Sequence, residues 1–172
     1  MITEWTAEEM RTGLDDLSGI LHACVLDGAS VGFILPHDLS DARAFWQGLL
    51  AQVQSGARRL FVAVEEGHAV GVATLITAMP DNQPHRGEVS KLLVHPDHRR
   101  KGLARQLMQH LEMTARDMGK GLLTLDTRTG DNAEPLYRDL GYQTAGVIPG
   151  YCLDAGGQHL DSTTYMFKPL SA

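Results

Sequence analysis

The chain has 172 residues, of which 43% are hydrophobic and 21% charged, and its formal net charge is −6. This length supports one domain, 1–172, whose core needs neither metal nor disulfide support. No apolar run approaches the ~20 residues that cross a bilayer, so we expect a soluble protein with no membrane partner. The acidic charge argues against nucleic acid as a partner, because a polyanion would be repelled.

The first residues, Met1 to Trp5, lack the basic flank and apolar stretch of a secretory signal, so the cytoplasm is the expected location. The two cysteines, Cys24 and Cys152, are far apart and form neither a disulfide framework nor a metal motif. His95 and His98 have no third ligand at a suitable spacing, so we expect no metal.

The first half of the chain is predicted to form two helices and then two strands. Apolar residues recur at spacings of three and four from Thr6 to Val25, which predicts one amphipathic helix. A second helix is predicted from Ser40, as its N-cap, to Val53. Segments 60–64 and 70–76 are rich in β-branched residues, and the connection 65–68 predicts an antiparallel hairpin.

The second half alternates strands and helices. The predicted elements are a strand at 88–94, a helix at 102–118, a strand at 122–125, a helix at 133–140, and strands at 144–148 and 163–167. This order predicts an α/β (α+β) domain in which helices flank a central mixed, mostly antiparallel sheet.

The junction between strand 88–94 and the helix from 102 has the features of an anion site. Residues 99–104 fit the pattern Arg-x-x-Gly-x-Ala. The first backbone N–H groups of a helix lack intrahelical partners and carry partial positive charge, and the small residues Gly102 and Ala104 would let a diphosphate approach. The alternative is a basic loop that only caps a surface helix.

Three segments resemble successive motifs of the GNAT N-acetyltransferases: 92–96 (LLVHP), 99–104 (RRKGLA) and 132–142 (NAEPLYRDLGY). The resemblance implies a GNAT-type domain with acetyl-CoA as co-substrate. It places the coenzyme diphosphate on Arg100, Lys101, Gly102, Leu103 and Ala104, with Arg99 flanking.

The resemblance also implies that the pantetheine arm lies along Leu93 and Val94, in the manner of a strand added to a sheet edge. Asn132 occupies the position of a coenzyme-contacting asparagine in this family. The alternative for Asn132 is the N-cap of the helix that follows it.

Candidate acid and base residues accompany these motifs. Tyr137, in Leu-Tyr-x-x-x-Gly-Tyr, would be the general acid that protonates the departing CoA thiolate, and the alternative is an aromatic side chain that packs on its helix. An amine must lose a proton before it attacks a thioester, and Glu88 and Asp126 on neighbouring strands are the candidate bases. The alternative for each carboxylate is an exposed strand end. The transfer would be direct, with no covalent enzyme intermediate.

A narrower resemblance, to the tabtoxin-resistance branch of this family, is carried by four segments: 28–33, 88–92, 125–127 and 149–152. It implies that the acceptor is a small molecule with a primary amine, such as an amino-acid-like compound, an antibiotic or a toxin. It makes Ser30, Phe33 and Tyr151 candidates for the substrate wall. Family analogy also suggests a homodimer.

Two other functions fit parts of the sequence. Gly28 to Gly32 satisfies Gly-x-Ser-x-Gly, the nucleophile elbow of serine hydrolases, with Ser30 as nucleophile. A predicted helix precedes it, however, where that elbow needs a buried strand. A non-catalytic acyl-CoA-binding regulatory module would keep the fold without turnover, and the presence of Tyr137 and Glu88 argues against it.

Overall fold

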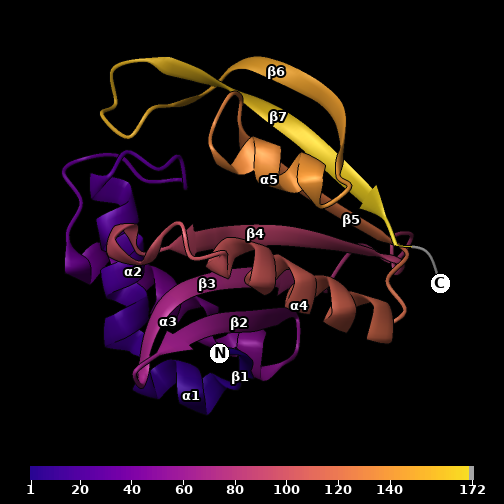
Figure 1. The fold of residues 1–172 in the computed structure, drawn as a ribbon, viewed down its shortest axis with the longest axis horizontal. Coiled ribbons are helices and arrows are strands. Elements are labelled where there is room, and N and C mark those ends of the chain that lie inside the picture. The colour runs from indigo at the N-terminus through magenta and orange to yellow at the C-terminus, as the bar shows by residue number, and fades with distance from the viewer. Residues whose placement is uncertain (171–172) are drawn as a thin grey trace.

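A computed structural model describes residues 1–170 (Figure 1). The elements, in chain order, are β1 (Ile2–Trp5), α1 (Ala7–Thr12), α2 (Leu14–Leu26), α3 (Leu39–Gln54), β2 (Arg58–Glu65), β3 (His68–Ile76), β4 (Arg86–Val94), a 3-10 turn η1 (Pro96–His98), α4 (Leu103–Asp117), β5 (Leu122–Arg128), α5 (Ala133–Asp139), β6 (Gln143–Leu153) and β7 (Leu160–Pro169). Within the described range, none of the helices has the length and apolar character needed to span a membrane.

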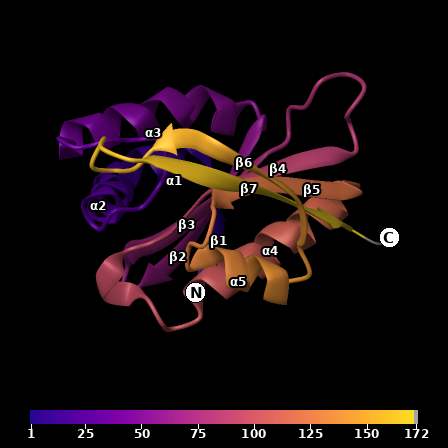
Figure 2. The same cartoon turned by 90° about the horizontal axis from the view of Figure 1, so that it is seen from above.

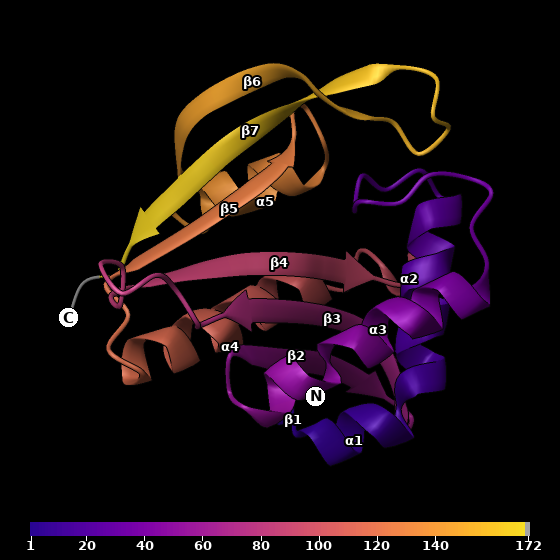
Figure 3. The ribbon, with the colours of Figure 1, turned by 180° about the vertical axis from the view of Figure 1, so that it is seen from behind.

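The seven strands form one sheet in the order β1-β2-β3-β4-β5-β7-β6. All neighbouring pairs are antiparallel except β4 and β5, which are parallel. Helices α4 and α5 cover one face, and α1 to α3 cover the other (Figures 1 and 3). The predicted class, a mixed and mostly antiparallel sheet flanked by helices, is confirmed.

The N-terminal region differs from its predicted single helix. A short strand, β1, comes first and pairs with β2, and the helix is broken at Gly13 into α1 and α2. The Trp5 ring packs over Gly13 so closely that a Cβ there would lie 2.3 Å from it. The helical period of the apolar residues continues across this break, because α1 and α2 face the same core.

Several predicted boundaries also change. The N-cap of α3 is Asp38 and not Ser40, since the Asp38 carboxylate accepts from the backbone of Ser40 and Asp41 in a capping box. Glu65 and His68 are paired across the β2–β3 hairpin, which leaves a two-residue turn. Strands β5, β6 and β7 are longer than predicted, and β6 and β7 form an extended arm that lies along one edge of the molecule in Figure 1 and runs across it when seen from above (Figure 2).

The apolar core lies in two layers, one on each face of the sheet. Leu107, Leu111 and Phe61 belong to the layer between α4 and the sheet, and Trp46 and Leu17 belong to the layer under α2 and α3. Trp46 also donates its indole N–H to the Leu17 carbonyl at 2.9 Å, which joins α3 to α2. Strand residues alternate between the two layers, as the period of a strand requires.

Strands β4 and β5 stay together over only part of their length. Their register covers three pairs, Arg86–Leu122, Gly87–Leu123 and Glu88–Thr124. Beyond Glu88 the two strands diverge (Figure 3). Strand β5 stays paired with β7, which in turn pairs with β6 in the arm. The backbone of β4 from Val89 onward is therefore unpaired on its β5 side.

Candidate active site

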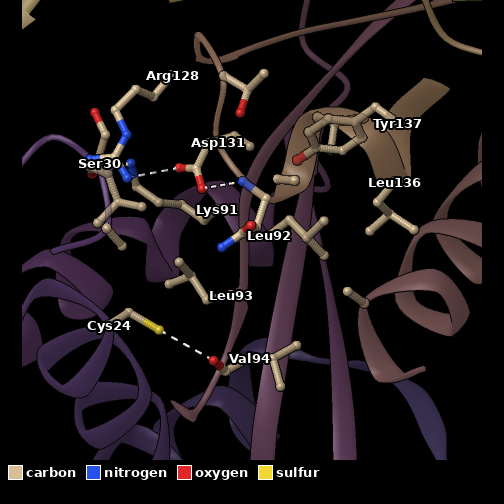
Figure 4. Close-up of a pocket in the computed structure, with 18 of the residues that line it drawn as sticks. Cys24, Ser30, Lys91, Leu92, Leu93, Val94, Arg128, Asp131, Leu136 and Tyr137 are labelled. Carbon is tan, nitrogen blue, oxygen red and sulfur yellow. Dashed lines mark hydrogen bonds and ion pairs between the residues drawn. The ribbon is translucent and has the colours of Figure 1, made fainter. Parts of the chain in front are cut away.

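A cavity of about 760 Å³ occupies the opening between β4 and β5. It runs from the N-terminus of α4, past β4 and α5, to the loop between α2 and α3 and the arm of β6. Figure 4 shows side chains from these elements converging on it, with Tyr137 on one side and Lys91 and Ser30 on another. The cavity is therefore built from segments that are up to 139 residues apart in sequence, Cys24 to Thr163.

One end of the cavity is an anion cradle at the N-terminus of α4. The helix begins after Gly102, which has a φ of 78°, and no side chain caps it. The space over Gly102 is open, since a Cβ there would meet nothing nearer than the Gln106 Nε2 atom at 3.8 Å. Arg100 is also in the left-handed region, at φ 66°, a conformation that costs a non-glycine residue about 1–3 kcal/mol. The loop thus holds strained backbone around an uncapped helix end, which suits a diphosphate.

Several basic side chains of this loop and of the first turn of α4 already have carboxylate partners. Lys101 Nζ donates to Glu65 Oε2 at 2.9 Å and Arg105 pairs with Asp139 at 3.1 Å. The ammonium of Lys101 and the ring of His98 hold the pKa of the Glu65 carboxyl below its usual value. Lys101 lies outside the cavity lining, whereas Arg100 lines it and has an exposed side chain.

Arg99 joins the loop to the neighbouring elements. Its guanidinium pairs with Asp27 at the end of α2 and donates from Nε to the Val94 carbonyl at 3.2 Å. The Cys24 thiol donates to the same carbonyl at 3.5 Å (Figure 4). Leu93 and Val94 line the cavity on the unpaired side of β4, so their backbone is where an extended chain would lie.

The two predicted bases share one face of the sheet. Glu88 is paired with Thr124, and Asp126 lies two residues further along β5, so both carboxylates point to the same side. Glu88 Oε2 accepts from Arg86 Nη1 at 3.1 Å, and Asp126 Oδ2 accepts from Thr163 Oγ1 at 3.0 Å. Both line the cavity.

Tyr137 projects from α5 with its ring buried against Tyr142, at 5.7 Å between ring centroids. Its hydroxyl points into the cavity (Figure 4). Burial, followed by the nearby carboxylates of Asp131 and Asp126, raises the pKa of Tyr137. The phenol is consequently protonated at physiological pH and is available as a proton donor, not as a base.

A family model described as the acetyltransferase (GNAT) family matches residues 34–142, which is more than half of the chain. The chain belongs to the GNAT family. It is therefore an acetyl-CoA-dependent acyltransferase, and the cradle, the β4 edge and Tyr137 all lie within or beside the matched region.

Individual GNAT relatives agree with this assignment. An uncharacterised N-acetyltransferase from the hisH–hisA intergenic region of Azospirillum brasilense is 30% identical over 137 residues, which cover 78% of this chain and 80% of that protein. The ribosomal-protein-alanine N-acetyltransferase of Brucella melitensis has the same fold, with a TM-score of 0.78, 24% identity and 99% of both chains covered. So does a phosphinothricin acetyltransferase of Sinorhizobium meliloti in complex with acetyl-CoA, with a TM-score of 0.78, 20% identity and 99% and 88% covered.

The part of this GNAT cavity beside β6 and the loop between α2 and α3 departs from the predicted substrate wall at one residue. Ser30 and Tyr151 line the cavity. The Ser30 hydroxyl lies 3.7 Å from Cys152 Sγ, and the Tyr151 hydroxyl lies 2.9 Å from Tyr165 Oη. Phe33 lies outside the lining. Phe33 belongs to the loop between α2 and α3, and its ring packs on His37 of the same loop and on Phe45 of α3 instead.

Three alternatives from the sequence can now be judged. Asn132 occupies the N-cap position of α5, as the alternative had it, but its side chain makes no capping bond, and Asn132 also lines the cavity. Ser30 has a cysteine rather than a histidine as its partner, and its loop follows a helix, which is incompatible with a hydrolase elbow. His98 bonds to Glu65 at 2.8 Å, and within residues 1–170 no three metal-ligating side chains cluster.

Sequence reasoning missed two basic residues of the GNAT cavity. Arg128 donates to the Gly28 carbonyl at 3.1 Å and pairs with Asp131 at 3.3 Å, while Lys91 Nζ donates to the Val31 carbonyl at 2.8 Å. Both tie the loop between α2 and α3 to the sheet. The available signal for Arg128 was its place just after Asp126 in the predicted strand region, and that for Lys91 was its place in segment 88–92, which carries the narrower resemblance.

Proposed function

We propose that the protein transfers the acetyl group of acetyl-CoA directly to a primary amine of a small molecule within a ternary complex. The observation that carries this proposal is the single cavity, which has an uncapped helix end at one extremity and two carboxylates further along. The cradle of Arg100, Gly102, Leu103 and Ala104 would hold the diphosphate. The unpaired edge of β4 would hold the pantetheine arm, which reaches toward Tyr137.

The proposed proton path begins at the acceptor. An ammonium group loses its proton to Glu88, or to Asp126, either directly or through water. The amine lone pair then attacks the thioester carbonyl, the carbon–sulfur bond breaks and CoA leaves as a thiolate. Two carboxylates on one face of the sheet support this assignment, since each is anchored by a neighbour, Arg86 or Thr163, and both face the cavity.

The path ends at Tyr137, which gives its proton to the departing sulfur. A buried phenol remains protonated, and an uncompensated thiolate is unfavourable next to it, so Tyr137 holds the proton that the departing sulfur needs. The phenolate is then reprotonated from the solvent that fills the cavity. The acylated nitrogen loses its second proton to the same solvent, so sulfur, amide and tyrosine end neutral, and the first acceptor proton remains on the carboxylate.

Release of CoA thiol in a panel of amines, amino acids, dipeptides and amine antibiotics would identify acceptors. With an acceptor in hand, Tyr137→Phe is expected to lower kcat by about 10²- to 10³-fold, because it removes the proton donor. Its Kd for acetyl-CoA should stay within twofold of the wild type. Glu88→Gln should lower turnover most at low pH, where few amine molecules are neutral.

The matched control is Tyr142→Phe. The Tyr142 hydroxyl is buried and has no hydrogen-bond partner among the described residues, so its loss should leave turnover unchanged. Equal turnover of Tyr137→Phe and the wild type would contradict the role of Tyr137. A wild type that binds acetyl-CoA but acetylates nothing in the panel would favour the non-catalytic coenzyme-binding module instead.

A further inference from the structure

Lys91 is placed in the cavity by a bulge in β4. Val72 pairs with Leu93 and Thr74 with Ser90, so Lys91 and Leu92 together oppose the single residue Ala73. Lys91 has a φ of 55°, in the left-handed region, which a lysine adopts only where the surrounding structure holds it. Such bulges reorient a side chain.

The bulge puts Lys91 on the side of the sheet where acceptor chemistry is proposed. Val89 belongs to the core layer under α4, so regular alternation would send Lys91 to that layer as well. Its Nζ atom instead donates to the Val31 carbonyl at 2.8 Å and lies 5.3 Å from the centroid of the Phe45 ring, both on the α2–α3 side. Lys91 therefore shares a face with Glu88.

The Lys91 ammonium donates one hydrogen bond, to the Val31 carbonyl, but has no carboxylate partner among the described residues. Three other basic residues that line the cavity have carboxylate partners: Arg99 with Asp27, Arg105 with Asp139 and Arg128 with Asp131. Within residues 1–170, no carboxylate oxygen lies within 4 Å of Lys91 Nζ. An ammonium has three N–H donors, so two remain for a ligand.

The electrostatic environment of Lys91 favours an incoming anion. The side chain is half-buried, and burial, followed by the nearby Arg58 guanidinium, lowers the pKa of Lys91, whereas Asp126 acts in the opposite direction. A partly desolvated cation beside a second cation is stabilised by a negative ligand group. An acceptor with an ammonium group alone would instead be repelled by Lys91.

We infer that Lys91 is a specificity-determining residue that binds a carboxylate of the acceptor while Glu88 and Asp126 bind its ammonium group. This inference rests on the proposed amine acetylation and narrows its acceptor to compounds that carry both charges, such as amino acids and short peptide-like molecules. Acceptors without an acidic group are discriminated against because they leave the Lys91 charge unpaired.

The test compares L-amino acids with their α-carboxamides, which differ only in the charged group. The wild type should prefer the acid by about tenfold to a hundredfold in kcat/KM, the range expected for one charge-assisted hydrogen bond in a partly buried site. Lys91→Met should abolish this preference mainly through a higher KM for the acid, with the amide little affected. Lys91→Arg, which keeps the charge, should retain part of the preference.

The matched control is Lys120→Met. Lys120 also donates to backbone carbonyls, those of Thr77 and Pro84, but lies outside the cavity, so its loss should leave the acid preference intact. An equal loss for acid and amide in Lys91→Met would show that Lys91 only holds the loop and would overturn the inference. A wild type that acetylates amines without preferring the acid would overturn it too, while amine acetylation would stand. A wild type with no amine activity would overturn both.

Discussion

Burial has opposite consequences for the two polar side chains that matter most at this site. It keeps the proton on Tyr137, whose pKa is raised, and it weakens the hold of Lys91 on its proton, whose pKa is lowered. In both cases desolvation of the charged form is the largest cause. A neutral phenol can then protonate sulfur, and a cation that is costly to bury gains from an anionic ligand.

The raised pKa of Tyr137 predicts a pH profile. The phenol should stay protonated above its usual value near 10, so turnover should rise with pH as the amine is deprotonated and should show no fall below about pH 10. An α-carboxamide acceptor is the suitable substrate, since it makes no use of Lys91. Measured from pH 6 to 10, a wild-type decline above pH 8.5 that is absent from Tyr137→Phe would contradict this assignment.

At the level of elements, the site depends on how β4 and α4 begin and end. The bulge in β4 turns Lys91 toward the acceptor side, and the divergence of β4 from β5 after Glu88 leaves a strand edge unpaired. The uncapped start of α4 then supplies N–H groups next to that edge. Each feature would weaken an ordinary domain slightly, and together they form one continuous cavity.

The α4 start can be tested by a pair of glycine substitutions. Gly102→Ala and Gly119→Ala each place a Cβ on a left-handed residue, at φ 78° and φ 74°, at opposite ends of α4. Both should lower the free energy of unfolding by about 1–2 kcal/mol, from backbone strain alone. Only Gly102→Ala should also weaken acetyl-CoA binding, by about tenfold in calorimetry, because its Cβ projects at the cradle. Equal affinities for both variants would remove Gly102 from the binding site.

For the whole molecule, stability and function share the sheet but use different parts of it. The layer under α4 and the layer under α2 and α3 bury the apolar residues on either side, and the cavity opens only where β4 and β5 part. The β5–β7–β6 part of the sheet carries Asp126 and Tyr151, so the proposed acceptor site depends on the C-terminal strands being paired correctly. Ligand binding should therefore stabilise the fold as a unit.

Two measurements separate core packing from coenzyme binding. Leu107→Ala, at a fully buried position of α4, should lower the free energy of unfolding by about 2–5 kcal/mol through cavity formation. Met113→Ala, on the exposed side of the same helix, should change it by less than about 0.5 kcal/mol. CoA at 100 times its Kd should stabilise each protein by about 2.7 kcal/mol. A denaturant series in which CoA adds nothing would count against the cavity as the coenzyme site.

Sequence patterns predicted the elements with strong periodicity and missed those that depend on contacts. Helix α4 and strands β2 to β4 were expected within a few residues, because apolar side chains repeat with the period of each structure. Strand β1 was missed, since four residues are too few to show an alternation. The break at Gly13 was missed because it depends on the Trp5 ring, which packs there only in the folded chain.

The sequence by itself determined the anion motif at 99–104 and the chemical types of the candidate acid and bases, because helix starts and residue chemistry are local properties. Only the tertiary structure decided which charges are free to act. Lys101 is paired with Glu65, 36 residues away, and Arg99 with Asp27, 72 residues away, while Lys91 has no carboxylate partner among residues 1–170. Ion pairs form between groups that the fold brings together, and burial sets their strength, so neither can be read from neighbours along the chain.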